Sequence, residues 1–226
     1  MSSPTTAAFD ATHARNYDRQ LEPIRSFKDA LHLLARAAFS RLPGTARILV
    51  AGAGTAAEAR YFAPLFPGWR FTLVDPSAAM LDVARQHAEA EGFVDRCDFH
   101  VGLVSDLPVE AHDAATSLLV SHFLVEEDRR VAFFRDIADR LKPGGLLFSA
   151  DLAADPDHPS FATLMDLWLT LYVSPERQDG YRAMFGRGVA AHPPAQVEAM
   201  MVRAGFAPPA ACYQTALLRG WVAIKA

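Results

Sequence analysis

The feature of this 226-residue sequence that most constrains its fold is a regular alternation of short apolar runs with longer helical patterns. A short apolar run bounded by turn residues is typical of a buried strand, whereas apolar residues at three-to-four-residue steps indicate an amphipathic helix. Because parallel neighbouring strands need a crossover long enough to hold a helix, the alternation predicts parallel βαβ units in a doubly wound α/β fold. The strand-like runs are 46–51, 71–74, 99–101, 114–120 and 146–150, and the helical patterns between them lie at about 56–65, 77–91 and 127–141.

Two segments outside this alternation are predicted to cover the sheet. Residues 26–42 carry an amphipathic helical pattern that Pro43-Gly44 ends, shortly before the first strand. Residues 152–193 follow the fifth strand and hold an aromatic-rich helical stretch at 160–172 and a second short segment near 181–185. Open α/β sheets bind ligands outside the carboxyl ends of their strands, so we expect this insertion to form lid helices. Helices that only pack on the surface are an equal alternative.

The C-terminal part of the sequence predicts a change of strand direction. A helix at about 195–204 ends at Gly205, and two strand-like runs follow at 211–218 and 221–224. The link between these runs is Arg219-Gly220, and a two-residue link that contains glycine suits a hairpin. We therefore expect the last two strands to be antiparallel.

Composition and charge argue against several classes of function. The chain has 22 basic and 26 acidic residues, a net charge of -4 and no polybasic run, so we expect neither a nucleic-acid partner nor an anionic membrane surface. Cys97 and Cys212 are the only cysteines, and their separation predicts neither a disulfide framework nor a metal site. Residues 1–10 lack a basic start followed by an apolar core, and no uncharged apolar run approaches the length of a membrane span. These features predict a soluble, cytoplasmic protein of one domain, residues 1–226, in which residues 1–25 form an N-terminal cap.

A glycine loop and a spaced acid predict a nucleoside-containing cofactor. Gly52-Ala53-Gly54 lies directly after a strand-like run and before a helical pattern, where backbone can approach a ligand and the helix N-terminus offers unpaired N–H groups. Asp75 ends the next strand about twenty residues later, where a carboxylate can accept hydrogen bonds from both hydroxyls of a ribose. The alternatives are a tight turn without a ligand and an Asp75 that caps the helix near Ser77.

Two classes of cofactor compete for this loop. The residues GAGTAA at 52–57 fit the relaxed dinucleotide fingerprint, which keeps an NAD(P)-dependent oxidoreductase open. Three other features are the amphipathic helix before the first strand, the LKPGG stretch at 141–145 before the fifth, and the closing hairpin. Together they resemble the class I S-adenosylmethionine-dependent methyltransferases over residues 26–226. The resemblance implies a Rossmann-like, seven-stranded α/β/α sandwich that is mostly parallel, with the last strand antiparallel beside the fifth. It also implies S-adenosylmethionine as cofactor and S-adenosylhomocysteine as product.

The same resemblance implies the residues of a cofactor site. The glycine loop is expected to hold the methionine and ribose portion, and the acid after the second strand is expected to hold the ribose diol. Apolar residues after the second and third strands are expected at the adenine, and the end of the fourth strand is expected beside the sulfonium. In that order the residues are Ala51, Gly52, Ala53 and Gly54; Asp75; Pro76, Met80, Leu103 and Val104; and Ser121.

Two positions depart from the pattern of that family. Val50 stands where the family usually has an acid before the glycines, and Leu103 stands where it often has an aspartate that receives the exocyclic amine of adenine. Each departure removes a hydrogen-bond partner worth roughly 1–3 kcal/mol when the other group is buried. Asp106 is a candidate substitute at the adenine end, and a non-catalytic nucleoside-binding module is an alternative function.

Methyl transfer to a small molecule needs few catalytic groups, because the protein mainly positions the acceptor and removes its proton. His122, directly after the fourth strand, is the candidate general base, and a histidine that only hydrogen-bonds within its loop is the alternative. Tyr17 lies in the N-terminal segment, which we expect to fold over the pocket. Asp151 leaves the fifth strand at the ligand edge, but no nucleophile–base–orienter set is visible. The aromatic residues expected to line an acceptor cavity are Trp168, Tyr172 and Tyr181.

A closer resemblance concerns the C-terminal third. The stretches YRAM at 181–184, AGF at 204–206, YQ at 213–214 and VAIKA at 222–226 resemble the carboxy-S-adenosylmethionine synthases. In those enzymes an arginine that aligns with Arg182 grips the cofactor's carboxylate; here a grip on an acceptor carboxylate and a surface pair are the alternatives. Phe27 replaces a tyrosine of that family, and Val50 and Leu103 replace its acids. The sequence therefore predicts a methyltransferase that acts on a small-molecule acceptor as a monomer or homodimer, with a synthase of this kind as the first alternative.

Overall fold

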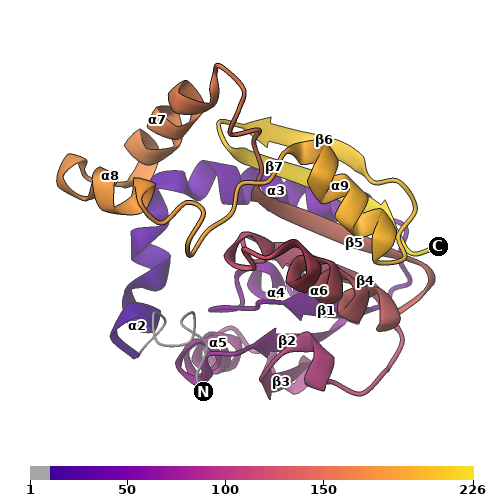
Figure 1. Ribbon diagram of the computed structural model, residues 1–226. Coiled ribbons are helices and arrows are strands. Elements are labelled where there is room, and N and C mark those ends of the chain that lie inside the picture. Colours follow the sequence, from indigo (N-terminus) through magenta and orange to yellow (C-terminus); the bar gives the residue numbers. More distant parts are fainter. Residues whose placement is uncertain (1–10) are drawn as a thin grey trace.

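The computed structural model describes residues 11–226, which contain a seven-stranded sheet with the order β3-β2-β1-β4-β5-β7-β6 (Figure 1). Strands β1 to β5 are parallel, β7 is antiparallel to β5, and β6 is antiparallel to β7. This topology confirms the predicted doubly wound sheet with an antiparallel C-terminal hairpin. The strands are β1 (Arg47–Ala51), β2 (Arg70–Asp75), β3 (Cys97–Val101), β4 (His112–Leu118), β5 (Leu141–Leu152), β6 (Ala210–Thr215) and β7 (Leu218–Ile224).

Helices cover both faces of the sheet. The α-helices are α2 (Ala11–Gln20), α3 (Arg25–Ala38), α4 (Ala57–Phe62), α5 (Ala78–Ala90), α6 (Glu127–Asp139), α7 (Phe161–Tyr172), α8 (Pro175–Arg182) and α9 (Pro194–Arg203). The short 3₁₀ helices are η1 (Glu22–Ile24), η2 (Val94–Arg96), η3 (Val104–Asp106) and η4 (Ser121–Phe123). Helices α3, α4 and α5 pack on one face and α6 and α9 on the other, while α2, α7 and α8 gather at the left of Figure 1. Between residues 11 and 226, no helix has both the length and the apolar character needed to cross a membrane.

Alternation of side chains along β1 divides the apolar core between the two faces. Ile48 and Val50 belong to the core under α3, α4 and α5, whereas Leu49 and Ala51 belong to the core under α6 and α9. Successive side chains of a strand point to opposite faces, and all four of these are buried. A parallel strand covered on both faces has no polar side, which explains why this run is continuously apolar in the sequence.

Local signals set the helix starts nearest the carboxyl edge of the sheet. Ser77 is the N-cap of α5, and its side chain accepts a hydrogen bond from the Met80 amide at 3.3 Å. Helix α6 begins with Glu127 and Asp128, whose negative charges suit the positive N-terminal end of a helix. Helix α8 begins with Pro175, which lacks the N–H that a first turn leaves unpaired.

The C-terminal hairpin turns earlier than the sequence predicts. Thr215 pairs with Leu218, so the link is Ala216-Leu217, and Arg219-Gly220 lies within β7. Ala216 has a φ of 45°, the left-handed region that tight hairpin turns use. Gly220 serves close packing instead, because a Cβ there would come within 3.1 Å of the Cβ of Tyr213. The turn signal of this glycine was therefore misread.

Helices α2, α7 and α8 lie together at the left of Figure 1. Helix α2 and η1 belong to the segment predicted to form an N-terminal cap; residues 1–10 of that segment lie outside the described residues. Helix α7 contacts both α8 and η1, and α2 contacts α5. Helix α8 spans Pro175–Arg182 instead of a segment near 181–185, since the proline after Ser174 is an N-terminal signal that the prediction did not use.

Candidate active site

The strand order places a crevice beside β1. This strand pairs with β2 on one side and β4 on the other, and open α/β sheets bind ligands at such a switch point. In the loop that follows β1, Gly52 and Gly54 have φ of 75° and 51°. The amides of Gly52 and Ala53 both donate to the carbonyl of Val74, at 2.9 and 2.8 Å. A Cβ on Gly52 would collide with the side chain of Val120, so the loop requires glycine there.

Asp75 fastens the glycine loop to the start of α5. Its Oδ2 accepts a hydrogen bond from the Gly54 amide at 2.9 Å, and its Oδ1 accepts one from the Ser77 amide at 2.8 Å. Burial raises the pKa of this carboxyl above its ordinary value, and the two amide hydrogen bonds oppose that rise. The helix-cap alternative therefore fits only in part, because the side chain of Ser77 caps α5 while Asp75 joins the loop to the helix.

The residues predicted at the adenine divide into buried and exposed ones. Met80 and Val104 are buried, whereas Pro76 and Leu103 are exposed. Asp106, the candidate substitute, already accepts a hydrogen bond from the Leu103 amide at 2.8 Å through Oδ2. Its carboxylate therefore stabilises the turn that begins η3, and a contact with adenine stays a prediction.

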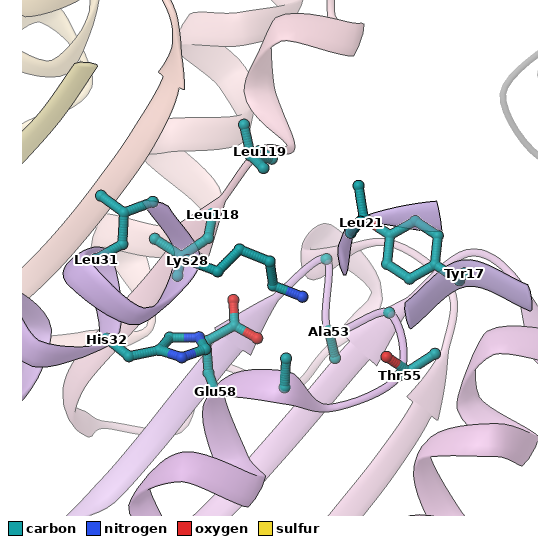
Figure 2. Close-up of a pocket in the computed structure, with 13 residues that line it drawn as sticks. Tyr17, Leu21, Lys28, Leu31, His32, Ala53, Thr55, Glu58, Leu118 and Leu119 are labelled. Atoms are coloured by element: carbon teal, nitrogen blue, oxygen red, sulfur yellow. The ribbon is translucent and has the colours of Figure 1, made fainter. Parts of the chain in front are cut away.

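A small cavity of about 40 Å³, called the loop cavity below, borders the glycine loop. In Figure 2, the side chain of Lys28 extends past the carboxylate of Glu58, which lies between the Lys28 ammonium and the ring of His32 in this view. The sequence analysis selected none of these three residues. The cavity is lined by Tyr17, Leu21, Lys28, Leu31, His32, Gly52, Ala53, Gly54, Thr55, Ala57, Glu58, Leu118 and Leu119.

Glu58 brings a buried carboxylate to the loop cavity, and His32 brings a ring nitrogen without a hydrogen-bond partner. Glu58 is only 6% exposed, and none of the ion pairs found in residues 11–226 includes it. Burial raises its pKa to about 7, although its own backbone amide and the charge of Lys28 oppose the rise. Burial and the same charge lower the pKa of His32 to about 4, and its Nε2 has no hydrogen-bond partner. Buried polar groups are normally paired, so this arrangement is typical of a ligand site.

A usable signal for these residues was present in the sequence. Lys28 and His32 lie on the same stripe of α3 as the buried Leu31, and Glu58 lies on the same face of α4 as the buried Phe62. Charged residues on an apolar stripe mark a polar site under a helix. The helical periodicity locates these helices but does not by itself single out the polar positions on their apolar stripes.

A second cavity of about 920 Å³, called the large cavity below, lies between the N-terminal segment, the end of β4 and the inserted segment. The predicted residues Tyr17, His122, Trp168 and Tyr181 all line it. Tyr17 also lines the loop cavity, so the two cavities are neighbours. The side chain of Tyr172, the third predicted aromatic residue, lies outside the described residues.

Asp151 lies directly behind His122. Its Oδ1 lies 2.8 Å from Nδ1 of His122 and accepts a hydrogen bond from the His122 amide at 3.1 Å. Its Oδ2 accepts a hydrogen bond from Ser121 Oγ at 2.5 Å, and Arg130 Nε donates to the same hydroxyl at 2.8 Å. Because a carboxylate only accepts, Nδ1 carries the hydrogen, and in the neutral imidazole Nε2 then has the lone pair. The structure thus supplies an orienting group that the sequence analysis did not find.

The charges in this cluster keep Asp151 ionised. Burial alone would raise the pKa of Asp151, but the hydrogen bond with His122 and the charge of Arg130 hold it below its ordinary value. Arg130 is fully buried, with a guanidinium nitrogen 3.7 Å from Oδ2 of Asp151. An ionised carboxylate in this position can orient the imidazole and stabilise a proton that it accepts.

Comparison with known proteins places these features in a family. Residues 48–145 match the family model described as "Methyltransferase domain", and the match includes the glycine loop, Asp75 and His122. The chain carries a class I methyltransferase domain. This confirms the family resemblance that the sequence analysis states. The family implies the use of S-adenosylmethionine.

The curated proteins similar to this chain include an O-methyltransferase and a carboxy-S-adenosyl-L-methionine synthase. A ubiquinone biosynthesis O-methyltransferase from Methylocella silvestris is 34% identical over 108 residues, which cover 47% of this chain and 40% of that protein. A carboxy-S-adenosyl-L-methionine synthase from Aeromonas hydrophila is 31% identical over 141 residues, which cover 58% of this chain and 49% of that protein. This chain spans from 25% to 50% of the length of the curated relatives that it matches.

Solved structures share the methyltransferase fold. A putative O-methyltransferase from Nostoc punctiforme superposes with a TM-score of 0.71 at 17% identity. The superposition covers 95% of this chain and 59% of that one. At this level of identity the likeness shows the fold alone.

Eight of the predicted site residues line neither cavity: Ala51, Asp75, Pro76, Met80, Leu103, Val104, Ser121 and Arg182. Ser121 is fully buried, and its hydroxyl contacts Asp151 and Arg130, so its side chain supports the His122 cluster; a place beside the sulfonium stays a prediction. Arg182 donates to Asp166 at 2.7 Å and lines neither cavity, which is the surface-pair alternative.

Proposed function

We propose that this chain binds S-adenosylmethionine and transfers its methyl group to a hydroxyl of a small-molecule acceptor. The observation that carries the proposal is the His122–Asp151 pair, because His122 lines a cavity of about 920 Å³ beside the glycine loop. A cavity of this volume lies in the range of small-molecule sites. The O-methyltransferase name of the Methylocella silvestris relative and the net charge of -4 support a small acceptor over a nucleic acid.

The loop cavity suits the amino-acid end of the cofactor. That end carries one ammonium and one carboxylate, and the cavity offers one buried carboxylate, Glu58, and one ammonium, Lys28. Val50 leaves β1 without the usual acid, and Glu58 supplies a carboxylate from α4 instead. Asp75 would hold the ribose hydroxyls, and the glycine loop would allow close approach of the methionine portion. The chemistry of these residues therefore fits the cofactor.

The size of the loop cavity shows what must move for the cofactor to enter. Its volume of about 40 Å³ is far below the roughly 300–1,000 Å³ of small-molecule sites. Asp18 of α2 accepts a hydrogen bond from Thr55 Oγ1 at 2.7 Å and pairs with Arg60 at 3.4 Å, which ties α2 to the loop and α4. We therefore propose that cofactor binding displaces α2.

The groups of the large cavity supply the acid–base chemistry. When bound, S-adenosylmethionine would supply a methyl group that its positive sulfur activates. As the acceptor oxygen bonds to the methyl carbon, the carbon–sulfur bond would break and the sulfur would keep the electron pair. Nε2 of His122 takes the proton of the acceptor hydroxyl, and ionised Asp151 stabilises the imidazolium through Nδ1. Trp168 belongs to the wall that positions the acceptor and excludes water.

Calorimetry with S-adenosylhomocysteine tests the cofactor part of this proposal. Binding by the full chain, together with transfer of methyl to a member of a hydroxylated acceptor panel, would support it. Clear binding of NAD without binding of S-adenosylhomocysteine would contradict the proposal and favour an NAD(P)-dependent oxidoreductase. Binding of S-adenosylhomocysteine with no methyl loss across the panel would favour a non-catalytic binding module.

A carboxy-S-adenosylmethionine synthase-like enzyme is the second candidate. The 31% identity over 141 residues to the Aeromonas hydrophila synthase favours it. Arg182, the residue that the resemblance assigns to the extra carboxylate, pairs with Asp166 in this structure. Mass spectrometry of the ligand that copurifies with the chain separates the two candidates, because the carboxylated cofactor has its own mass.

A further inference from the structure

The large cavity carries an excess of positive charge although the whole chain is negative. Its lining includes four arginines and one acidic residue, Glu126, whereas the chain has a net charge of -4. A site whose charge opposes that of the whole protein favours ligands of the opposite sign. The arginines come from different elements: Arg19 from α2, Arg129 from α6, Arg177 from α8, and Arg187 from the chain after α8.

One of the four arginines is neutralised within the cavity. Nε of Arg129 lies 3.1 Å from Oε2 of Glu126, which forms an ion pair. None of the ion pairs in residues 11–226 includes Arg19, Arg177 or Arg187. Three guanidinium groups of the cavity are thus without a carboxylate.

The polar contacts of these arginines are with neutral groups. Arg19 donates to the side-chain oxygen of Asn16 at 2.7 Å. Arg177 donates to the hydroxyl of Tyr181 at 3.3 Å, and its guanidinium carbon lies 5.4 Å from the centre of the Tyr181 ring. Such contacts orient a guanidinium and leave its charge available to a ligand.

Three carboxylates on the neighbouring elements pair with cations other than the three free arginines, whereas Glu176 and Asp179 of α8 are in none of the ion pairs of residues 11–226. Asp18 pairs with Arg60 at 3.4 Å, Glu22 with Arg25 at 3.4 Å, and Asp166 with Arg182 at 2.7 Å.

We propose that the acceptor is a largely apolar, hydroxylated molecule with an anionic group, a carboxylate or a phosphate, that Arg19, Arg177 and Arg187 bind. Guanidinium groups pair well with both anions. The apolar part of the acceptor would lie against Trp168 and Phe185, which line the same cavity. This inference rests on the proposed function, because it names the class of its acceptor. The anion is the binding group and a hydroxyl is the methyl acceptor, since an ionised carboxylate needs no base and His122 is a base.

Three naphthalene probes test the inference by binding alone. Hydroxynaphthoate and naphthyl phosphate are anionic, dihydroxynaphthalene is neutral, and all three share the same ring. Calorimetry on the full chain with S-adenosylhomocysteine present should show at least one anionic probe binding about tenfold more tightly than the neutral one. Added salt should weaken only the anionic probes.

Variants of the three arginines complete the test. The triple variant Arg19→Gln, Arg177→Gln, Arg187→Gln should lose the preference for the anion and keep its affinity for the neutral probe. Arg36→Gln, at an exposed position of α3 outside the cavity lining, changes the net charge as much as each single variant does and should keep the preference. If the triple variant fails to fold, each single variant should show part of the loss.

The controls separate this inference from the function on which it rests. Equal affinity of the wild-type chain for anionic and neutral probes would overturn it, as would a preference that survives in all the folded arginine variants. If S-adenosylhomocysteine binds and one of these two results is found, only the inference of an anionic acceptor is overturned, and the proposed function stands. Absence of S-adenosylhomocysteine binding overturns the proposed function, whatever the probes do.

Discussion

The amide of Gly54 donates a hydrogen bond of 2.9 Å to Oδ2 of Asp75, so the loop after β1 is fastened to the end of β2. Asp75→Ala removes this bond together with the proposed ribose contact. We expect its affinity for S-adenosylhomocysteine to fall by about 1–3 kcal/mol, measured by calorimetry. Asp82→Ala, at an exposed position of α5, is the matched control and should bind normally. Unchanged affinity in Asp75→Ala would remove Asp75 from the cofactor site.

Glu58→Gln should stabilise the chain in the absence of ligand at mildly alkaline pH. The pKa of Glu58 rises from 4.5 to about 7 in the folded chain, so the folded state keeps a proton that the unfolded state has released. The free energy of unfolding therefore falls by about 3 kcal/mol in total as the pH rises through the window from 4.5 to about 7. Urea unfolding should show the stabilising effect above the window and little of it below pH 4.5. An effect of equal size on both sides of the window would contradict the assignment; Glu89→Gln, exposed on α5, is the control.

Binding of the cofactor's ammonium should make Glu58 release its proton. Near pH 6.5 the carboxyl is largely protonated, because burial raises its pKa to about 7, and a bound cation favours the ionised form. Calorimetry in buffers of different ionisation enthalpy should therefore show proton release on binding S-adenosylhomocysteine. The release should shrink as the pH rises above the window and should be absent in Glu58→Gln. Identical proton release in wild type and variant would place the ammonium elsewhere.

Asp151→Asn should destabilise the chain at neutral pH, by about 3–5 kcal/mol, because it leaves a buried arginine without its charge partner. The pKa of Asp151 lies below its ordinary 3.8, so its ionised form contributes stability above that value. This stability is lost as the pH falls through the lower folded value, and wild type and variant should then converge. Urea unfolding from neutral to acid pH measures the difference. Asp139→Asn, exposed at the end of α6, should stay close to wild type throughout.

His122→Ala should lower kcat by about 10²–10⁴ with an identified acceptor, because the general base is lost. Its affinity for S-adenosylhomocysteine should stay within about twofold of wild type, since His122 lines the large cavity and not the loop cavity. His158→Ala, in the exposed start of the inserted segment, is the control for loss of a histidine. Intact turnover in His122→Ala would end the general-base proposal.

The fold could be predicted because its determinants are local in the sequence. The continuous apolar run of β1 and the spacing from Gly52 to Asp75 fix a parallel strand, a loop and the next strand end without knowledge of distant contacts. The hairpin turn was misplaced, because Ala216-Leu217 carries no turn signal and Gly220 has a packing role.

The partners within the candidate site could not be predicted in the same way. His122 was selected from its place after β4, but its hydrogen bond to Asp151 depends on β5 lying beside β4. Lys28 and Glu58 come from the helices that precede and follow β1 in the sequence, and only the packed structure brings them to one cavity. Sequence position indicated His122, whereas its partner and the Lys28–Glu58 arrangement depend on the packing of distant elements.

Tyr17 forms part of the wall between two chambers, because it borders both the loop cavity and the large cavity. An outward swing of α2 that admits one ligand must also open the chamber beside it. We therefore expect ordered binding, in which S-adenosylmethionine binds before the acceptor. The large cavity would reach its final shape only after α2 has returned. Departure would follow the reverse order, with the spent donor leaving last.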